Sequence, residues 1–123
     1  MIINKPNGNG IDRIRKATLC SIKGFKAAFK YESAFRQELF LCLILLPISF
    51  FIAKDVGTWL ILLISMLFLL FAEVVNSAIE ALADRISIEH SELIGRAKDL
   101  GSACVFIAFI ILLLVWSYAL MGF

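Results

Sequence analysis

Hydrophobic residues are concentrated in three runs, and short polar segments separate them. The runs cover residues 39–53, 56–72 and 100–123, and none contains a charged residue. The first run is short for a bilayer, but it becomes long enough when the preceding residues from Phe35 are included. The pattern therefore predicts three transmembrane helices, over residues 35–53, 56–83 and 100–122, the second of them with a cytoplasmic extension.

The segment before these runs has a different pattern. Residues 11–31 place apolar side chains at intervals of three and four, which is one face of a helix, and most cations lie off that face. Such a stripe is typical of a helix that lies in the membrane interface. We expect a flexible tail over residues 1–10 and an amphipathic surface helix over 11–31. The alternative is a soluble helix packed on a core, but the chain offers no other soluble core.

Composition and charge support a membrane protein of one domain. The chain has 123 residues, of which 61% are hydrophobic and 18% charged, more apolar material than a small soluble domain can bury. Lysine and arginine are concentrated in the N-terminal segment and in residues 85–98, which predicts a cytoplasmic N-terminus and a C-terminus on the periplasmic side. Basic residues beside apolar spans favour an anionic lipid surface over nucleic acid as partner.

A polar stripe follows the second hydrophobic run. Glu73, Asn76, Glu80 and Asp84 are three, four and four residues apart, so they share one face of a helix. Carboxylates near the hydrocarbon edge cost several kcal/mol unless they are paired or hydrated. The stripe therefore requires basic side chains, protons or a metal ion nearby.

Two further glutamates, Glu32 and Glu38, lie at the same predicted boundary. Carboxylates from two helices at one depth suit Mg²⁺ when phosphates complete its coordination. Three alternatives remain open: hydrogen bonding that only joins helices, a purely structural helix bundle, and a small cation transporter or channel. A conduit predicts acids deep within the spans, whereas Glu73 lies near one end and the third run has none.

The segment GRAKDLGSA, residues 95–103, precedes the third run. Lys98 and backbone donors at a helix start would favour an anion. The alternative is that Arg96 and Lys98 simply anchor the cytoplasmic side. Neither a GxxxxGK[ST] nor a GxGxxG motif occurs in the sequence, so a nucleotide site here is of another type.

Three stretches together resemble the small bacterial integral-membrane diacylglycerol kinases: YESAFRQE at 31–38, EVVNSAIEALADRI at 73–86 and GRAKDLGSA at 95–103. The resemblance covers nearly the whole chain. It implies an all-α homotrimer in the bacterial inner membrane, with active sites shared between subunits, that uses MgATP to phosphorylate diacylglycerol. The nearest alternative is an undecaprenol kinase of the same fold, and AFRQE and GSA favour the diacylglycerol branch.

The resemblance also implies roles for single residues. Glu73 corresponds to the general base, Asn76 to a second residue of the catalytic centre, and Asp84 supports the site. Mg²⁺ would be held by Glu32 and Glu80. The expected ATP contacts are Arg13, Glu32, Glu80, Glu89, Lys98 and Asp99. The expected lipid contacts are Arg13, Arg36, Gln37, Glu38, Trp59, Glu73, Ser102 and Trp116. The sequence departs from the family pattern Glu-Tyr-His at residues 89–91, which read Glu89, His90 and Ser91.

Overall fold

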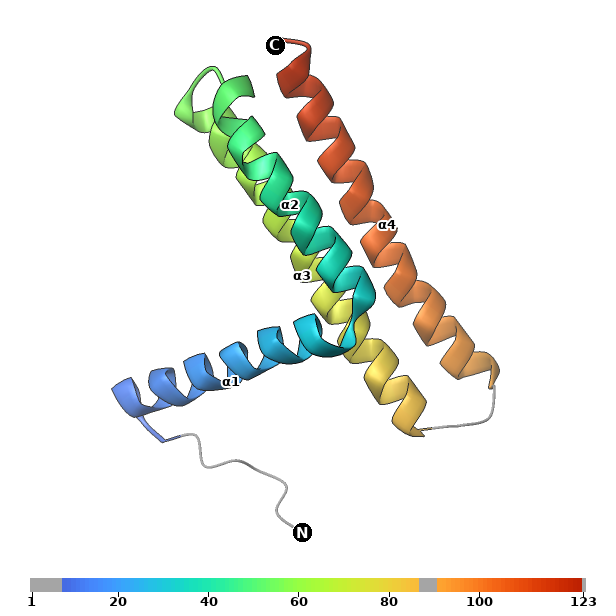
Figure 1. Cartoon of the computed structure of the whole chain (residues 1–123). Helices are drawn as coiled ribbons and strands as arrows, with labels where there is room; N and C mark the ends of the chain where they lie inside the picture. The colour runs from blue at the N-terminus through green and yellow to red at the C-terminus, as the bar shows by residue number, and fades with distance from the viewer. Residues whose placement is uncertain (1–7, 87–90, 123) are drawn as a thin grey trace.

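The computed structural model describes residues 8–86 and 91–122 of the chain, and in these ranges it is all-helical. Glu89 and His90 therefore lie outside the described residues, as does most of the predicted tail. The helices are α1 (Gly10–Tyr31), α2 (Ser33–Ile52), α3 (Val56–Ile86) and α4 (Glu92–Leu120). Helices α2, α3 and α4 run along one another, and α1 crosses them at one end (Figure 1). By length and composition each of the three is able to cross a membrane, which confirms an all-helical chain with three candidate spans.

Helix α4 begins well before the apolar run that predicted it. Ser91 is its N-cap, and the Ser91 hydroxyl oxygen accepts a hydrogen bond of 3.1 Å from the backbone N–H of Ile94. Such a cap satisfies one of the free N–H groups at a helix start. Residues 92–99, which lie in the polar segment before the third hydrophobic run, are therefore a polar extension of the helix.

Helix α3 is the centre of the fold, since it packs against both α4 and α2. Leu62 and Leu69 of α3 are completely buried, and Ala108 of α4 is buried against the same core. The buried face of α3 continues along the helix to Glu73 and Asn76. Glu73 and Asn76 of the acidic stripe thus continue the packed face and point into the protein, whereas Asp84 at the other end of the stripe is exposed.

Two tryptophans join the helices at the end far from α1. The Trp116 indole N–H of α4 donates to the Ser65 hydroxyl of α3 over 3.2 Å, and that hydroxyl donates to the Leu62 carbonyl. The Trp59 indole N–H of α3 donates in the same way to the Ser49 hydroxyl of α2 over 3.1 Å. Because few polar groups are available in hydrocarbon, such pairs fix how neighbouring helices align.

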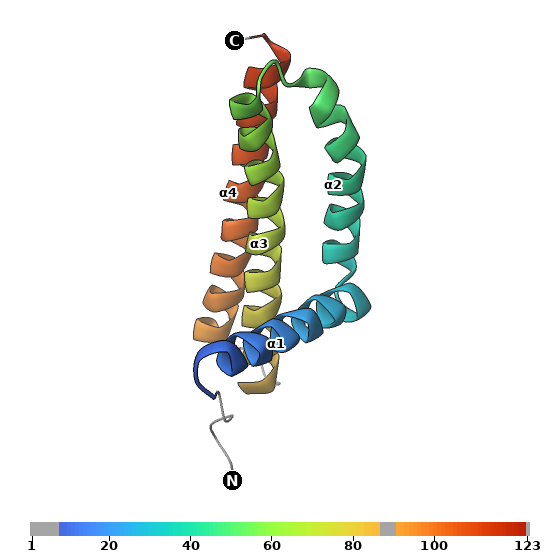
Figure 2. The ribbon, with the colours of Figure 1, turned by 90° about the vertical axis from the view of Figure 1, so that its left-hand side faces the viewer.

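The turn between α2 and α3 is also held in place. An Asp55 carboxylate oxygen accepts a hydrogen bond of 2.7 Å from the Thr58 backbone N–H, which holds the pKa of Asp55 below its usual value. The Lys54 ammonium donates to the carbonyl of Gly122, just after α4. These contacts connect α2, α3 and α4 at this end of the protein, where the turn between α2 and α3 lies beside the end of α4 (Figure 2).

We expect Ser65→Ala to weaken the packing of α4 on α3, because it leaves the buried indole N–H of Trp116 without an acceptor. The free energy of unfolding, measured by titration with SDS in a mild detergent, should fall by about 0.6 to 1.7 kcal/mol. The control is Ser117→Ala, at an exposed position of α4. Equal effects of the two substitutions would contradict a stabilising role for the indole hydrogen bond.

Candidate active site

The site is built around a corner between α1 and α2. Glu32 is the single residue between these helices, and its backbone is extended, with φ −112° and ψ 104°. Its N–H donates to the Ala28 carbonyl, and its own carbonyl accepts from the Arg36 N–H. The Arg36 guanidinium donates to the carbonyls of Phe29 (2.7 Å) and Lys30 (3.1 Å), which satisfies the end of α1. The corner therefore has a defined geometry.

An open cavity of about 450 Å³ lies beside this corner, lined by residues of α2, α3 and α4, and we call it the acidic cavity. Four carboxyl groups line it, those of Glu32, Glu38, Glu73 and Glu80. The remaining lining residues are Ser33, Ala34, Asn76, Ser102, Val105, Phe106 and Phe109. One side is thus rich in carboxyl groups, and the α4 side is largely apolar.

The carboxyl groups differ in their access to solvent. Glu73 is 4% exposed and Glu38 is 8% exposed, whereas Glu32 and Glu80 are half-buried. Glu38 Oε2 and Asn76 Oδ1 are buried without a hydrogen-bond partner among residues 8–86 and 91–122. Buried polar atoms are usually satisfied in folded proteins, and exceptions are frequent at functional sites. The inner part of the cavity therefore has unused capacity to bind a polar ligand.

Two polar contacts extend the site along α3. The Asn76 side-chain nitrogen donates to Glu80 Oε1 over 3.3 Å, one helical turn away. One turn further, the Asp84 carboxylate lies 2.6 Å from the Lys98 ammonium of α4. This pair is partly exposed, so it adds little to stability. Its main effect is to hold a cation close to Glu80, with which Lys98 also interacts electrostatically.

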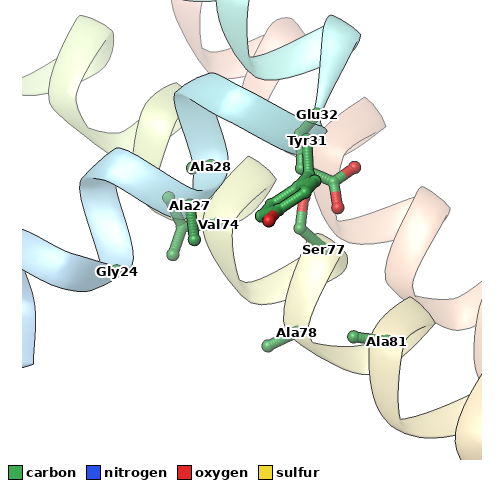
Figure 3. A pocket seen from close by; sticks show the side chains of 9 residues that line it. All are labelled: Gly24, Ala27, Ala28, Tyr31, Glu32, Val74, Ser77, Ala78 and Ala81. Atoms are coloured by element: carbon green, nitrogen blue, oxygen red, sulfur yellow. The ribbon is translucent and has the colours of Figure 1, made fainter.

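A second, apolar groove of about 420 Å³ separates α1 from α3. Figure 3 shows the small side chains that the two helices present to each other there. The groove is lined by Gly24, Ala27, Ala28, Tyr31, Glu32, Val74, Ser77, Ala78 and Ala81. Because Glu32 lines both spaces, the apolar groove is directly adjacent to the acidic cavity.

The structure brings six of the predicted site residues to the acidic cavity: Glu32, Glu38, Glu73, Asn76, Glu80 and Ser102. Lys98 and Asp84 pair beside it, while Arg36 caps α1. Arg13, Gln37 and Asp99 are exposed and do not line the cavity. Their assignments to substrate or ATP remain predictions.

Trp59 and Trp116 are not part of this cavity. Both indoles lie toward the opposite end of the helices, where each N–H is hydrogen bonded to a serine of a neighbouring helix. The expectation that they line a lipid cleft stays a prediction, and in this chain their evident contribution is to helix packing.

Sequence analysis missed the apolar wall of the cavity, formed by Val105, Phe106 and Phe109. Together with Ser102 they recur at helical intervals, so they share one face of α4. That spacing was the only available signal. It is weak because every face of a transmembrane helix is apolar, and the wall is identified only by what packs opposite it.

The carboxyl groups of the acidic cavity suit a hard divalent cation that takes only a few of its ligands from the protein. Across the described residues, His, Cys, Asp and Glu side chains form no group of three or more able to hold a metal ion. Mg²⁺ needs fewer protein ligands, because it commonly binds one or two carboxylates together with substrate phosphates and water. Glu32 and Glu80, half-buried in one cavity, fit that type of site.

Three apolar helices with a carboxyl-lined cavity at one end define a small membrane protein with a polar site at the edge of its spans. The family model described as prokaryotic diacylglycerol kinase matches residues 19–120. The chain therefore belongs to the prokaryotic diacylglycerol kinase family, and the resemblance found in its motifs is confirmed.

Individual relatives support the same family assignment. The chain is 45% identical to the diacylglycerol kinase of Haemophilus influenzae over 108 aligned residues. The alignment covers 88% of this chain and 92% of the relative. It is 44% identical over 114 residues to that of Escherichia coli K12, covering 93% of each. The diacylglycerol kinase of Pseudomonas aeruginosa is 41% identical, with 92% of each chain covered.

We expect Glu38→Gln to stabilise the protein. The substitution removes a carboxyl group that is buried beside Glu73, and it introduces an amide whose N–H groups can donate to Glu73. The free energy of unfolding in detergent should rise by about 1 to 3 kcal/mol. Glu92→Gln, at a side chain that is 90% exposed, is the control and should have little effect. An unchanged or lower stability of Glu38→Gln would show that the buried carboxyl group does not oppose folding.

Proposed function

We propose that this protein transfers the γ-phosphoryl group of ATP to the hydroxyl group of diacylglycerol, which yields phosphatidic acid and releases ADP. The observation that carries the proposal is the acidic cavity itself, in a chain of the prokaryotic diacylglycerol kinase family. Its carboxyl groups converge at the end of three apolar helices, where a lipid headgroup and a water-soluble nucleotide are able to meet.

Glu73 is the proposed general base. It is the most buried of the four carboxyl groups of the cavity. A lipid whose glycerol lies at the interface presents its hydroxyl from the apolar side, and Glu73 accepts the proton as that oxygen attacks the γ-phosphorus. Val105, Phe106 and Phe109 line the α4 side of the cavity, and with lipid bound these apolar side chains would limit access of water, which would otherwise compete with the lipid hydroxyl.

Phosphoryl transfer depends mainly on positioning and on neutralising charge. When bound by Glu32 and Glu80, Mg²⁺ supplies that neutralisation on the phosphate oxygens. Lys98, which Asp84 holds beside Glu80, adds a second positive charge. Glu80 and Lys98, which would contact the nucleotide, are thus at the more exposed side of the site, and Glu73, which would contact the lipid hydroxyl, is at the buried side.

Helix α1 is proposed to lie on the cytoplasmic surface of the bacterial inner membrane. Its apolar stripe is exposed in the chain, as seen at Ile11, Ile14, Phe25 and Phe29. These side chains would enter the lipid while the cations of α1 bind anionic headgroups. The apolar groove under α1 would then accept part of an acyl chain beside Glu32.

The active protein is proposed to be a homotrimer with sites shared between subunits. Arg13, Gln37 and Asp99 are predicted substrate or ATP contacts, yet they are exposed and lie off the cavity of their own chain. A neighbouring subunit would bring such residues to the site.

The activity is tested by incubating the purified protein with labelled ATP, Mg²⁺ and a short-chain diacylglycerol, and separating the lipids by thin-layer chromatography. We expect label in phosphatidic acid, and Glu73→Gln should lower the rate by roughly 10²- to 10⁴-fold because the general base is lost. Glu92→Gln should retain the wild-type rate. Label in undecaprenol alone would assign a different lipid substrate, and full activity of Glu73→Gln would refute the proposed base.

Shared sites are tested with Glu73, which lines the cavity, and Asp99, which a neighbouring subunit would bring to it: Glu73→Gln and Asp99→Asn proteins, each of low activity, are mixed under conditions that allow subunits to exchange. If the two residues come from different subunits, some mixed sites carry both wild-type residues, and we expect part of the activity to return. Each variant mixed with itself is the control. Failure of the mixture to regain activity, although subunit exchange is demonstrated with labelled protein, would place each site within one chain.

A further inference from the structure

Gly101 of α4 is buried directly against Asn76 of α3. A Cβ atom at this position would overlap the Asn76 Oδ1 atom and would lie 3.5 Å from Asn76 Cγ. The backbone of Gly101 lies in an ordinary helix, so no unusual dihedral angle requires glycine. Glycine within a helix is about 1 kcal/mol less favourable than alanine. The close approach of the Asn76 amide is therefore the feature that accounts for glycine at this position.

The contact determines how the Asn76 amide is oriented. Its oxygen is buried toward α4 without a hydrogen-bond partner in the described part of the chain, while its nitrogen donates to Glu80 Oε1 over 3.3 Å. Asn76 is 9% exposed, so the amide has little space to move. With the α4 backbone behind the oxygen, the N–H₂ group faces Glu80.

We propose that Gly101 is a positioning residue of the kinase reaction: the missing side chain makes room for the Asn76 amide, which in turn holds the Glu80 carboxylate in the acidic cavity. The effect on turnover rests on the proposed function. A methyl group at position 101 would push the amide away from α4 and disturb its hydrogen bond to Glu80. The carboxylate would then be misplaced with respect to the Mg²⁺-bound phosphates.

Ordinary helix packing is the competing explanation, since small residues often let membrane helices approach each other. Ala108 is an example, because it is completely buried in the apolar core. Gly101 differs in that the nearest neighbour is the polar amide of a cavity residue and not an apolar side chain. A packing role would change stability alone, whereas a positioning role also changes kinetics and Mg²⁺ dependence.

The first experiment compares Gly101→Ala with Gly57→Ala in the lipid-labelling assay. Gly57 is a matched control because it also lies in a helix, and a Cβ atom there would be 3.4 Å from the Asp55 side chain, an ordinary contact. We expect kcat of Gly101→Ala to fall roughly 10- to 100-fold, because small misplacements near the reacting groups lower the rate by such factors. We also expect that more Mg²⁺ is required to reach the half-maximal rate. A folded Gly101→Ala protein with wild-type kcat and Mg²⁺ dependence would overturn the proposal.

The second experiment does not depend on activity. Unfolding in detergent is measured for wild type, Gly101→Ala, Asn76→Ala and the double variant, which form a double-mutant cycle. We expect Gly101→Ala to destabilise the wild type but not the Asn76→Ala background, where the space is free. If Gly101→Ala alone fails to fold, the double variant should fold. Equal destabilisation in both backgrounds, or a double variant that also fails to fold, would overturn the proposal. Inactive wild-type protein would refute the proposed function and leave this stability comparison unaffected.

Discussion

The burial of two carboxyl groups between neighbouring helices is the constraint that the rest of the structure must satisfy. Glu38 of α2 and Glu73 of α3 face one cavity and are almost completely removed from solvent. Such burial opposes folding, since each charge loses its hydration. The packing elsewhere offsets it: an apolar core joins α3 to α4, and two tryptophan–serine hydrogen bonds fix the far end of the three helices. The buried carboxyl groups are thus confined to one end of the spans, and the buried hydroxyl groups of Ser49 and Ser65, further along the spans, are hydrogen bonded.

The arrangement also separates the two kinds of substrate that the proposed reaction requires. The buried carboxyl group of Glu73 is adjacent to the phenylalanine wall, where a lipid hydroxyl would arrive. Glu80 and Lys98 are more exposed, where phosphates would arrive. Glu32 stands at the corner between α1 and α2 and borders the acidic cavity as well as the apolar groove. One short stretch of backbone thereby connects α1 to the site.

Sequence patterns were sufficient to predict the helices and the acidic face, because both depend on local periodicity. Glu73, Asn76 and Glu80 do share one cavity, as their spacing required. Asp84 has the same spacing but pairs with Lys98 outside the cavity, because α4 begins at Glu92, well before its apolar run. The close approach of Gly101 to Asn76 was not predictable. It depends on the register between two helices, and local sequence does not encode that register. The indole hydrogen bonds of Trp59 and Trp116 were missed for the same reason.

The central claim is that the acidic cavity binds a magnesium nucleotide. It is tested most directly by measuring the unfolding midpoint in detergent with a non-hydrolysable ATP analogue, with and without Mg²⁺, for wild type and Glu80→Gln. A ligand that binds only the folded state raises the midpoint. The account predicts a rise for the wild type that requires Mg²⁺ and is largely lost in Glu80→Gln. No shift in the wild type at saturating analogue, or an equal shift in Glu80→Gln, would contradict it.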